Sequence, residues 1–191
     1  MDRENMTTEQ SALPQVTEAE LAEAIEAATA EVFGTMLNLE CKPGKPFVET
    51  QEATPASGVV SLIGLAGSWI GTGSVSCSVP GACRMASALL STEYSGISED
   101  VLDAIAEITN MIVGNVKTSL ESRLGGMGLS TPTVIYGRNF QTRGARNKEW
   151  TVVPFEFDGD CMFVQVCISP NPDSNATAAR PGYPIPHMLI I

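Results

Sequence analysis

Residues 98–123 read SEDVLDAIAEITNMIVGNVKTSLESR, and this stretch decides the fold. Ser98 is a favourable N-cap, and the two acidic residues that follow it complement the positive end of a helix dipole. Apolar residues then recur mainly at intervals of three and four, the spacing of one helix face: Val101, Leu102, Ile105, Ile108, Ile112, Val116 and Leu120. The pattern predicts one long amphipathic helix that ends near Arg123, because glycines follow at positions 125, 126 and 128.

The opposite face of this helix carries a polar stripe. At about 100° per residue, Glu107 and Asn110 lie within about 40° of Asp103, and Lys117 and Glu121 extend the stripe toward the helix end. We expect these side chains to face solvent or a partner. A polar stripe on a surface helix is usually only a solvated face, so a function depends on whether these residues belong to a larger pattern.

The sequence on either side predicts one α+β domain, with an antiparallel-rich sheet and helices packed on one face. Further helices are expected over residues 17–37 and 82–90. Strands are expected over residues 46–53, 58–65, 70–79, 132–140, 149–157 and 161–169. Their order, α-βββ-αα-βββ, contains no βαβ repeat.

Two tight turns and two tails complete this organisation. The runs Ala66-Gly67-Ser68 and Asp158-Gly159-Asp160 predict hairpin turns between strands. Residues 1–16 are polar and are expected to form a mobile tail, and residues 170–191 are expected to form an irregular one. The folded domain is therefore predicted to span residues 17–169.

The composition excludes several classes of partner. Acidic residues outnumber basic ones by 22 to 11, which gives a net charge of -11. Such a surface repels phosphate backbones and anionic lipid headgroups, so we expect binding neither to nucleic acid nor to a membrane. The sequence has no signal-peptide pattern and no apolar run of about 18 residues, which predicts a cytoplasmic protein.

Few residues are available for other enzyme chemistries. His187 is the sole histidine and lies in the C-terminal tail, so a Ser-His-Asp or Cys-His arrangement lacks a base. The five cysteines form no CxxC pair, and we expect no metal site in this chain. Asp103 and Glu107 stand on adjacent turns of an exposed helix, without the cleft that raises the pKa of a glycosidase acid.

Asp103, Glu107, Asn110 and Pro132 fit the pattern Asp/Ser-x3-Glu-x2-Asn-x21-Pro. In this motif the sequence resembles the CheC/CheX/FliY family of bacterial chemotaxis phosphatases. The resemblance covers roughly residues 17–169 and extends through the run that begins at Asn110 (NMIVGNVK). It implies a CheC-like fold.

The number of motif copies separates the branches of this family. Members of the CheC type carry a second copy in the N-terminal helix, whereas here Thr29 stands where an asparagine would follow Glu26. One intact motif makes the chain most similar to the CheX branch, and that resemblance implies a homodimer.

The resemblance also implies an activity and a role for each residue. The substrate is a phosphorylated CheY-type response regulator, and the reaction is hydrolysis of its aspartyl phosphate. Asn110 orients the attacking water and Glu107 pairs with the regulator's lysine, so these two are the expected catalytic residues. Asp103, Lys117 and Pro132 are expected at the docking surface, Pro132 by shaping its loop. The regulator supplies its own divalent ion, Mg²⁺, and this chain needs no cofactor of its own.

Two alternatives stay open at this point. The chain could be a non-catalytic adaptor of the same fold that binds a response regulator or a flagellar switch component. It could also be a structural domain whose sheet edge mediates oligomerisation. The presence of Asn110 argues against the adaptor, and the structural domain is the weaker of the two alternatives.

Overall fold

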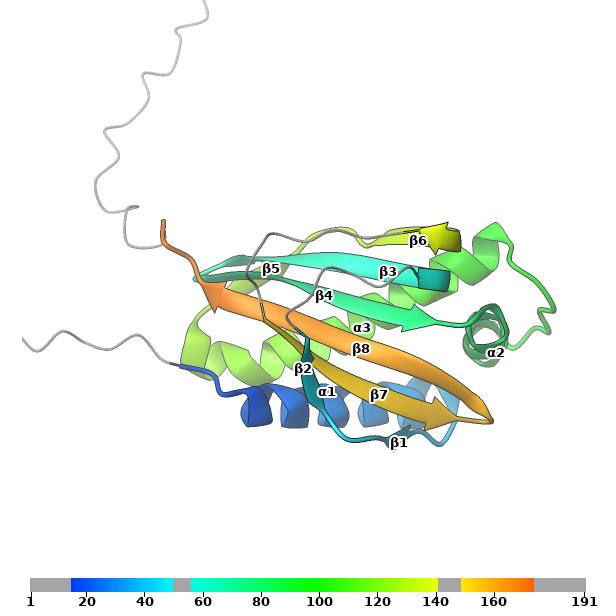
Figure 1. Cartoon of the computed structure of the whole chain (residues 1–191), viewed down its shortest axis with the longest axis horizontal. Helices are drawn as coiled ribbons and strands as arrows, with labels where there is room; N and C mark the ends of the chain where they lie inside the picture. Colours follow the sequence, from blue (N-terminus) through cyan, green and yellow to red (C-terminus); the bar gives the residue numbers. More distant parts are fainter. Residues whose placement is uncertain (1–14, 50–55, 141–148, 174–191) are drawn as a thin grey trace, which may run out of the picture.

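The computed structural model describes residues 15–49, 56–140 and 149–173 of the chain (Figure 1). Its helices are α1 (Glu18–Val32), which continues into the π-helical turn η1 (Phe33–Leu37), α2 (Val79–Leu90) and α3 (Glu99–Leu124). Its strands are β1 (Lys42–Pro43), β2 (Phe47–Glu49), β3 (Ala56–Gly67), β4 (Trp69–Cys77), β5 (Met127–Leu129), β6 (Thr133–Phe140), β7 (Trp150–Phe157) and β8 (Asp160–Pro170).

The expected order of helices and strands is confirmed, with β1 and β5 as additional short strands. Residues 50–53 of the first expected strand lie outside the described residues. Helix α2 begins at Val79, three residues before the predicted start, because the Ser78 hydroxyl accepts a hydrogen bond from the Gly81 amide (3.0 Å) and caps it. Pro80 is tolerated there because the amides of the first turn have no partner within the helix.

The strands form one antiparallel sheet in the order β1-β7-β8-β4-β3-β5. Strand β2 pairs with β7 on the same side as β1, and β6 pairs with β3 on the same side as β5. Helices α1 and α3 lie side by side on one face, and α2 lies at one end of the sheet (Figure 1). The predicted α+β class, with its antiparallel sheet and helices on one face, is confirmed.

Both predicted hairpin turns are present. Phe157 pairs with Asp160, and the two residues between them, Asp158 and Gly159, have φ angles of 45° and 82°. Two consecutive left-handed residues form a type I′ turn, whose twist matches that of the flanking strands. Between β3 and β4 the connection shortens to Ser68 alone.

The two predicted tails fall mostly outside the described residues, which omit 1–14 and 174–191. Of the parts that are described, Val16 packs against the core. Asn171 donates hydrogen bonds from its backbone amide to the Ser68 carbonyl (3.0 Å) and from its side chain to the Gly67 carbonyl (2.8 Å). No helix in the described residues is long and apolar enough to cross a membrane.

The predicted apolar face of α3 forms the centre of the core. Most of its residues are at most 1% exposed: Val101, Ile105, Ile108, Ile112 and Val116. Leu102 was expected on this face but is only half-buried, because it stands at the flank of the buried arc. Val113 packs directly onto β4, where a Cβ atom added to Gly73 would lie 2.6 Å from its Cγ2 atom.

Substituting Gly73 tests this seating of α3. In Gly73→Ala the added methyl overlaps Val113, so we expect a loss of about 1–3 kcal/mol in the free energy of unfolding. Urea denaturation measures it. Gly96→Ala is the matched control, because in the described structure no atom lies within 4 Å of the added methyl. Equal stability of the two variants would contradict the packing described here.

Candidate functional site

The predicted polar stripe lies on the outer side of α3. Asp103 and Glu107 are exposed and Asn110 is half-buried. Within the described residues, no hydrogen bond or ion pair occupies any of these three side chains. Two carboxylates and a carboxamide are thus available on successive turns of one rigid helix. These residues are called the α3 stripe below.

Helix α3 is tied to α1 along one flank. The Asn115 side-chain amide donates a hydrogen bond to Oε2 of Glu31 at 3.2 Å, and Arg123 forms an ion pair with Glu20. The hydrogen bond from Arg123, followed by those from Thr17, lowers the pKa of Glu20 to about 2. These contacts join one flank of α3 to α1 and leave the α3 stripe uncovered.

On the other side, the C-terminal half of α3 is tied to β5. The Lys117 Nζ atom lies 2.8 Å from Oε1 of Glu121, and the same oxygen accepts a hydrogen bond from the Met127 amide at 3.1 Å. The Lys117 hydrogen bond, and then that of Met127, lower the pKa of Glu121. Lys117 was predicted at the docking surface, and any such role requires it to leave this pair.

Pro132 lies in the connection between β5 and β6, which is fixed to β3. Ser130 donates its amide to the Gly64 carbonyl (2.9 Å), and its hydroxyl accepts from the Gly64 amide (2.9 Å). Pro132 itself is half-buried just before β6, where a residue without an amide hydrogen interrupts the strand pairing at no cost. Its neighbour β6 packs against α3, so this position suits the predicted role of shaping the loop.

The N-terminal helix offers no second stripe. Thr29 is completely buried, and its hydroxyl has no hydrogen-bond partner within the described structure. An asparagine at that position would point into the core. Helix α1 contains neither asparagine nor glutamine, so the single motif found in the sequence corresponds to a single exposed stripe in the described fold.

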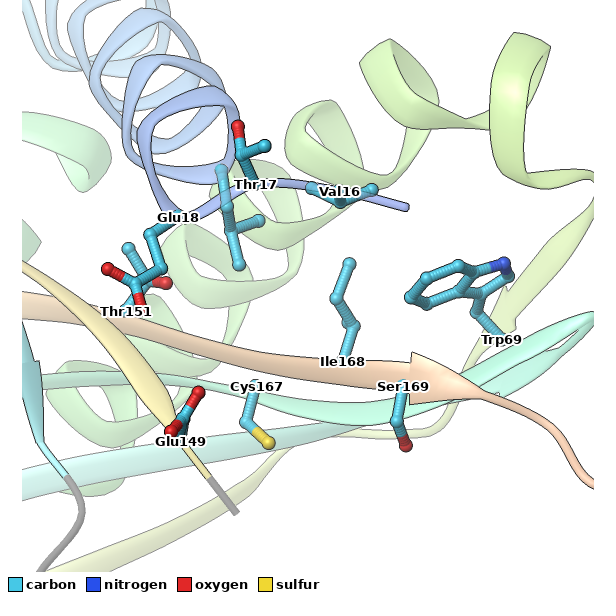
Figure 2. Close-up of a pocket in the computed structure, with 10 residues that line it drawn as sticks. Val16, Thr17, Glu18, Trp69, Glu149, Thr151, Cys167, Ile168 and Ser169 are labelled. Atoms are coloured by element: carbon cyan, nitrogen blue, oxygen red, sulfur yellow. The ribbon is translucent and has the colours of Figure 1, made fainter. Parts of the chain in front are cut away.

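The α3 stripe lies outside the cleft that the structure describes. Figure 2 shows this cleft, between the first turn of α1 and the end of β8, with Thr17, Trp69 and Ile168 among its lining residues. No residue of the α3 stripe lines it. A carboxamide on an open helix face can orient one water molecule but cannot enclose a substrate, so the stripe needs a partner surface to complete a reaction site.

The sequence did not point to two residues on either side of Pro132, Ser130 before it and Tyr136 after it. Tyr136 of β6 is 53% exposed although it belongs to a strand that borders α3. Its position could not be predicted, because alternation along β6 does not tell which face of the sheet the helices cover.

The chain is similar to known proteins over most of its folded part. Residues 59–156, which include all four motif residues, match the family model described as Chemotaxis phosphatase CheX. A relative from Thermotoga maritima, named CheY-P phosphatase CheX, is 30% identical over 127 residues, which cover 66% of this chain and 81% of the relative.

Solved structures show the same similarity. The CheX chain in the CheX–CheY–BeF3–Mg²⁺ complex from Borrelia burgdorferi is 29% identical, with a TM-score of 0.65 over 76% of this chain and 96% of that one. A CheC-like superfamily protein from Shewanella is 24% identical, with a TM-score of 0.70 over 81% of this chain and 99% of that one. At that identity the Shewanella protein shows a shared fold.

The Lys117–Glu121 pair predicts a pH-dependent stability. A carboxyl with a lowered pKa stabilises the fold above its ordinary pKa of 4.5, and this contribution is lost as the pH falls through the lowered value. Lys117→Met should therefore lower the unfolding midpoint at pH 7, and the difference from the wild type should shrink toward pH 3. Thermal unfolding at several pH values measures this.

Lys117→Met should also raise the pKa of Glu121 toward its ordinary value, although the remaining hydrogen bond from Met127 keeps it somewhat low. An NMR titration of Glu121 measures this pKa. Ser122→Ala, an exposed neighbour, is the control. An unchanged Glu121 pKa in Lys117→Met would show that the pair is absent in solution.

Proposed function

Because this chain belongs to the CheX family of chemotaxis phosphatases, we propose that it hydrolyses the aspartyl phosphate of a CheY-type response regulator. The family membership predicted from the four-residue motif is confirmed. The observation that carries the proposal is the Asn110 carboxamide, which has no hydrogen-bond partner among the described residues and is held on the outer side of a firmly packed helix, one turn from Glu107.

Two relatives support this substrate. The Thermotoga maritima protein is named as a phosphatase of CheY-P, and the Borrelia burgdorferi CheX was solved with CheY, BeF3 and Mg²⁺. The two exposed carboxylates of the α3 stripe lie outside the described cleft, which favours a macromolecular substrate, since small ligands bind in concave pockets.

Asn110 is proposed to position the attacking water. Its carboxamide oxygen accepts one hydrogen of the water, and its NH₂ group donates to the phosphoryl oxygens or to the regulator. The water oxygen attacks phosphorus, the bond to the aspartyl oxygen breaks, and the products are inorganic phosphate and a free carboxylate. Phosphoryl transfer depends on positioning and charge stabilisation, so one oriented water is a sufficient contribution from this side.

Glu107 is proposed to pair with the lysine of the regulator's active site. Its carboxylate has no ion-pair or hydrogen-bond partner among the described residues, so it can approach a cation without first breaking such a contact there. Such a pair sets the register of docking, which brings Asn110 to the phosphoryl group. Asp103, one turn earlier and exposed, adds a second polar contact at the edge of the same surface.

The receiver domain is proposed to bring the divalent ion, Mg²⁺, and this chain to bring no cofactor. The ion neutralises charge on the transferring phosphoryl group when it is bound. The residues of this chain then position the water, contact the regulator and exclude bulk solvent from the interface.

The roles of Lys117 and Pro132 as docking residues remain predictions. We propose that Pro132 acts by shaping the loop that borders α3, and that Lys117 acts, if it leaves Glu121, at the far end of the docking surface. A homodimer also remains a proposal, and measurement of the molecular mass in solution tests it.

Replacing Asn110 tests catalysis. Asn110→Ala removes the water-positioning group, and we expect a loss of about 10²–10³-fold in the rate of dephosphorylation, as for removal of one aligned donor from a transition state. Phosphate release from a phosphorylated receiver domain with Mg²⁺ gives this rate.

Asn115→Ala is the matched control, because it removes the same group five residues along α3, where the amide bonds to Glu31 instead. Its rate should stay close to wild type. If Asn110→Ala were as active as wild type, the catalytic proposal would be wrong. Binding of the receiver without any turnover by the wild type would favour the adaptor.

Replacing Glu107 tests docking. Glu107→Gln keeps the shape but removes the charge, and we expect KM to rise about tenfold while the salt dependence of kcat/KM weakens, since one charge pair is lost. Steady-state rates at low and high salt measure both quantities. Glu31→Gln removes a carboxylate from the neighbouring helix and should leave KM unchanged. A normal KM and salt dependence in Glu107→Gln would exclude the lysine pair.

A further inference from the structure

Tyr136 is an exposed aromatic residue on the edge of the sheet that borders α3. It is 53% exposed, and its strand β6 pairs with β3 and packs against α3. Among the described residues it is the most exposed large aromatic side chain. Tyrosine combines an apolar ring with a hydroxyl, and it is enriched at the energetic centres of protein interfaces.

The strand register shows which face of the sheet Tyr136 occupies. Tyr136 pairs with Val59, and directly paired residues of antiparallel strands share a face. Val59 is completely buried in the core beneath the helices. Val134, two residues before Tyr136, also packs against this core. Tyr136 therefore lies on the helix-covered face, at its open edge.

Another exposed aromatic residue, Phe163, lies on the opposite face of the sheet. Phe163 pairs with Ser76, which pairs with Val60, and Val60 pairs with Ile135. Ile135 points away from the helices because it alternates with Tyr136. Phe163, which is 38% exposed, thus lies on the face that the helices do not cover.

The pairing of β3 shows which part of α3 lies level with Tyr136. The strand position of Ile63 is level with Val113, because Ile63 pairs with Gly73 and Gly73 packs on Val113. Val59 lies four residues before Ile63. Four residues of strand span about 14 Å, and about nine residues of helix have the same length.

The direction along α3 is also defined. The C-terminal end of α3 contacts β5 through Glu121, and β5 pairs with the last residues of β3. Moving back along β3 therefore leads toward the N-terminal half of α3, the half that carries Asp103 and Glu107. In Figure 1 the end of β6 and the beginning of α3 lie together.

We propose that Tyr136 is a docking residue for the response-regulator receiver domain, and that its ring contacts the receiver beside the α3 stripe. This rests on the proposed function and adds the apolar contact that the stripe lacks. Exposed charged and polar pairs contribute little to affinity in water, whereas an aromatic ring that loses its solvent on binding contributes more.

The position of Tyr136 also determines which kinetic constant it affects. Because Tyr136 would contact the receiver beside the transferring phosphoryl group and not the group itself, we expect this contact to be equally strong before and during phosphoryl transfer. An interaction of equal strength in the ground state and the transition state affects KM and leaves kcat unchanged. Tyr136 thus sets affinity, whereas Asn110 sets the rate.

Kinetics of Tyr136 variants test this inference. Tyr136→Ala should raise KM for a phosphorylated receiver domain about tenfold, with kcat within about twofold of wild type. Tyr136→Phe keeps the ring and should stay near wild type. Phe163→Ala is the matched control, because it removes an exposed aromatic side chain from the opposite face. Tyr136→Thr, with a strand-favouring side chain, repeats the test if the alanine variant does not fold.

A binding measurement supports the kinetics. In an Asn110→Ala background, the affinity for a receiver domain treated with BeF3 and Mg²⁺ should fall about tenfold when Tyr136 is replaced by alanine. The mass in solution is measured for each variant. A change of mass in the Tyr136 variants that accounts for the loss of affinity would overturn the inference.

The outcomes separate the two proposals. A wild-type protein that neither binds nor dephosphorylates any receiver refutes the proposed function, and the inference about Tyr136 with it. An active wild type whose Tyr136→Ala variant keeps its KM, or loses kcat instead, refutes the inference alone. An equal effect of Phe163→Ala also refutes it.

Discussion

The burial of the apolar face of α3 against the sheet is the constraint on which the rest of the structure depends. Ile105, Ile108 and Ile112 are fully buried, and Val113 fills the space left by the missing side chain of Gly73. A turn of the helix by one residue, about 100°, would expose these groups and bury charged ones. The rotation of α3 is therefore set by hydrophobic burial, and the outward direction of Asp103 and Asn110 is its consequence.

Contacts on both flanks make this helix a rigid platform. Arg123 and Asn115 tie it to α1, and Glu121 ties it to the first residue of β5. The proposed chemistry benefits from such a platform, because an amide that orients water contributes through its position and loses effect when it moves. The described cleft lies away from the α3 stripe. The proposed active site is therefore shared, with this chain supplying the water-positioning half.

Much of the fold and most of the candidate site could be predicted. The alternation of polar and apolar residues located the long strands, and the Asp158-Gly159 turn identified its hairpin, because both signals are local. The strands β1 and β5 were missed, since segments of two or three residues carry no pattern and exist through their pairing with β7 and β3. Leu102 was expected on the buried face but is only half-buried, because a helical wheel does not show how far neighbouring elements wrap around the helix.

The sequence by itself determined the family, the faces of α3 and the four motif positions, because these depend on residue type and on spacing along one helix. The tertiary structure alone decided that Thr29 is buried, that the Met127 amide holds Glu121, and that Tyr136 lies on the helix-covered face of the sheet. Each of these depends on contact between segments distant in sequence or in separate elements. Such contacts are set by strand register and by the packing of helices on the sheet, and no local pattern encodes them.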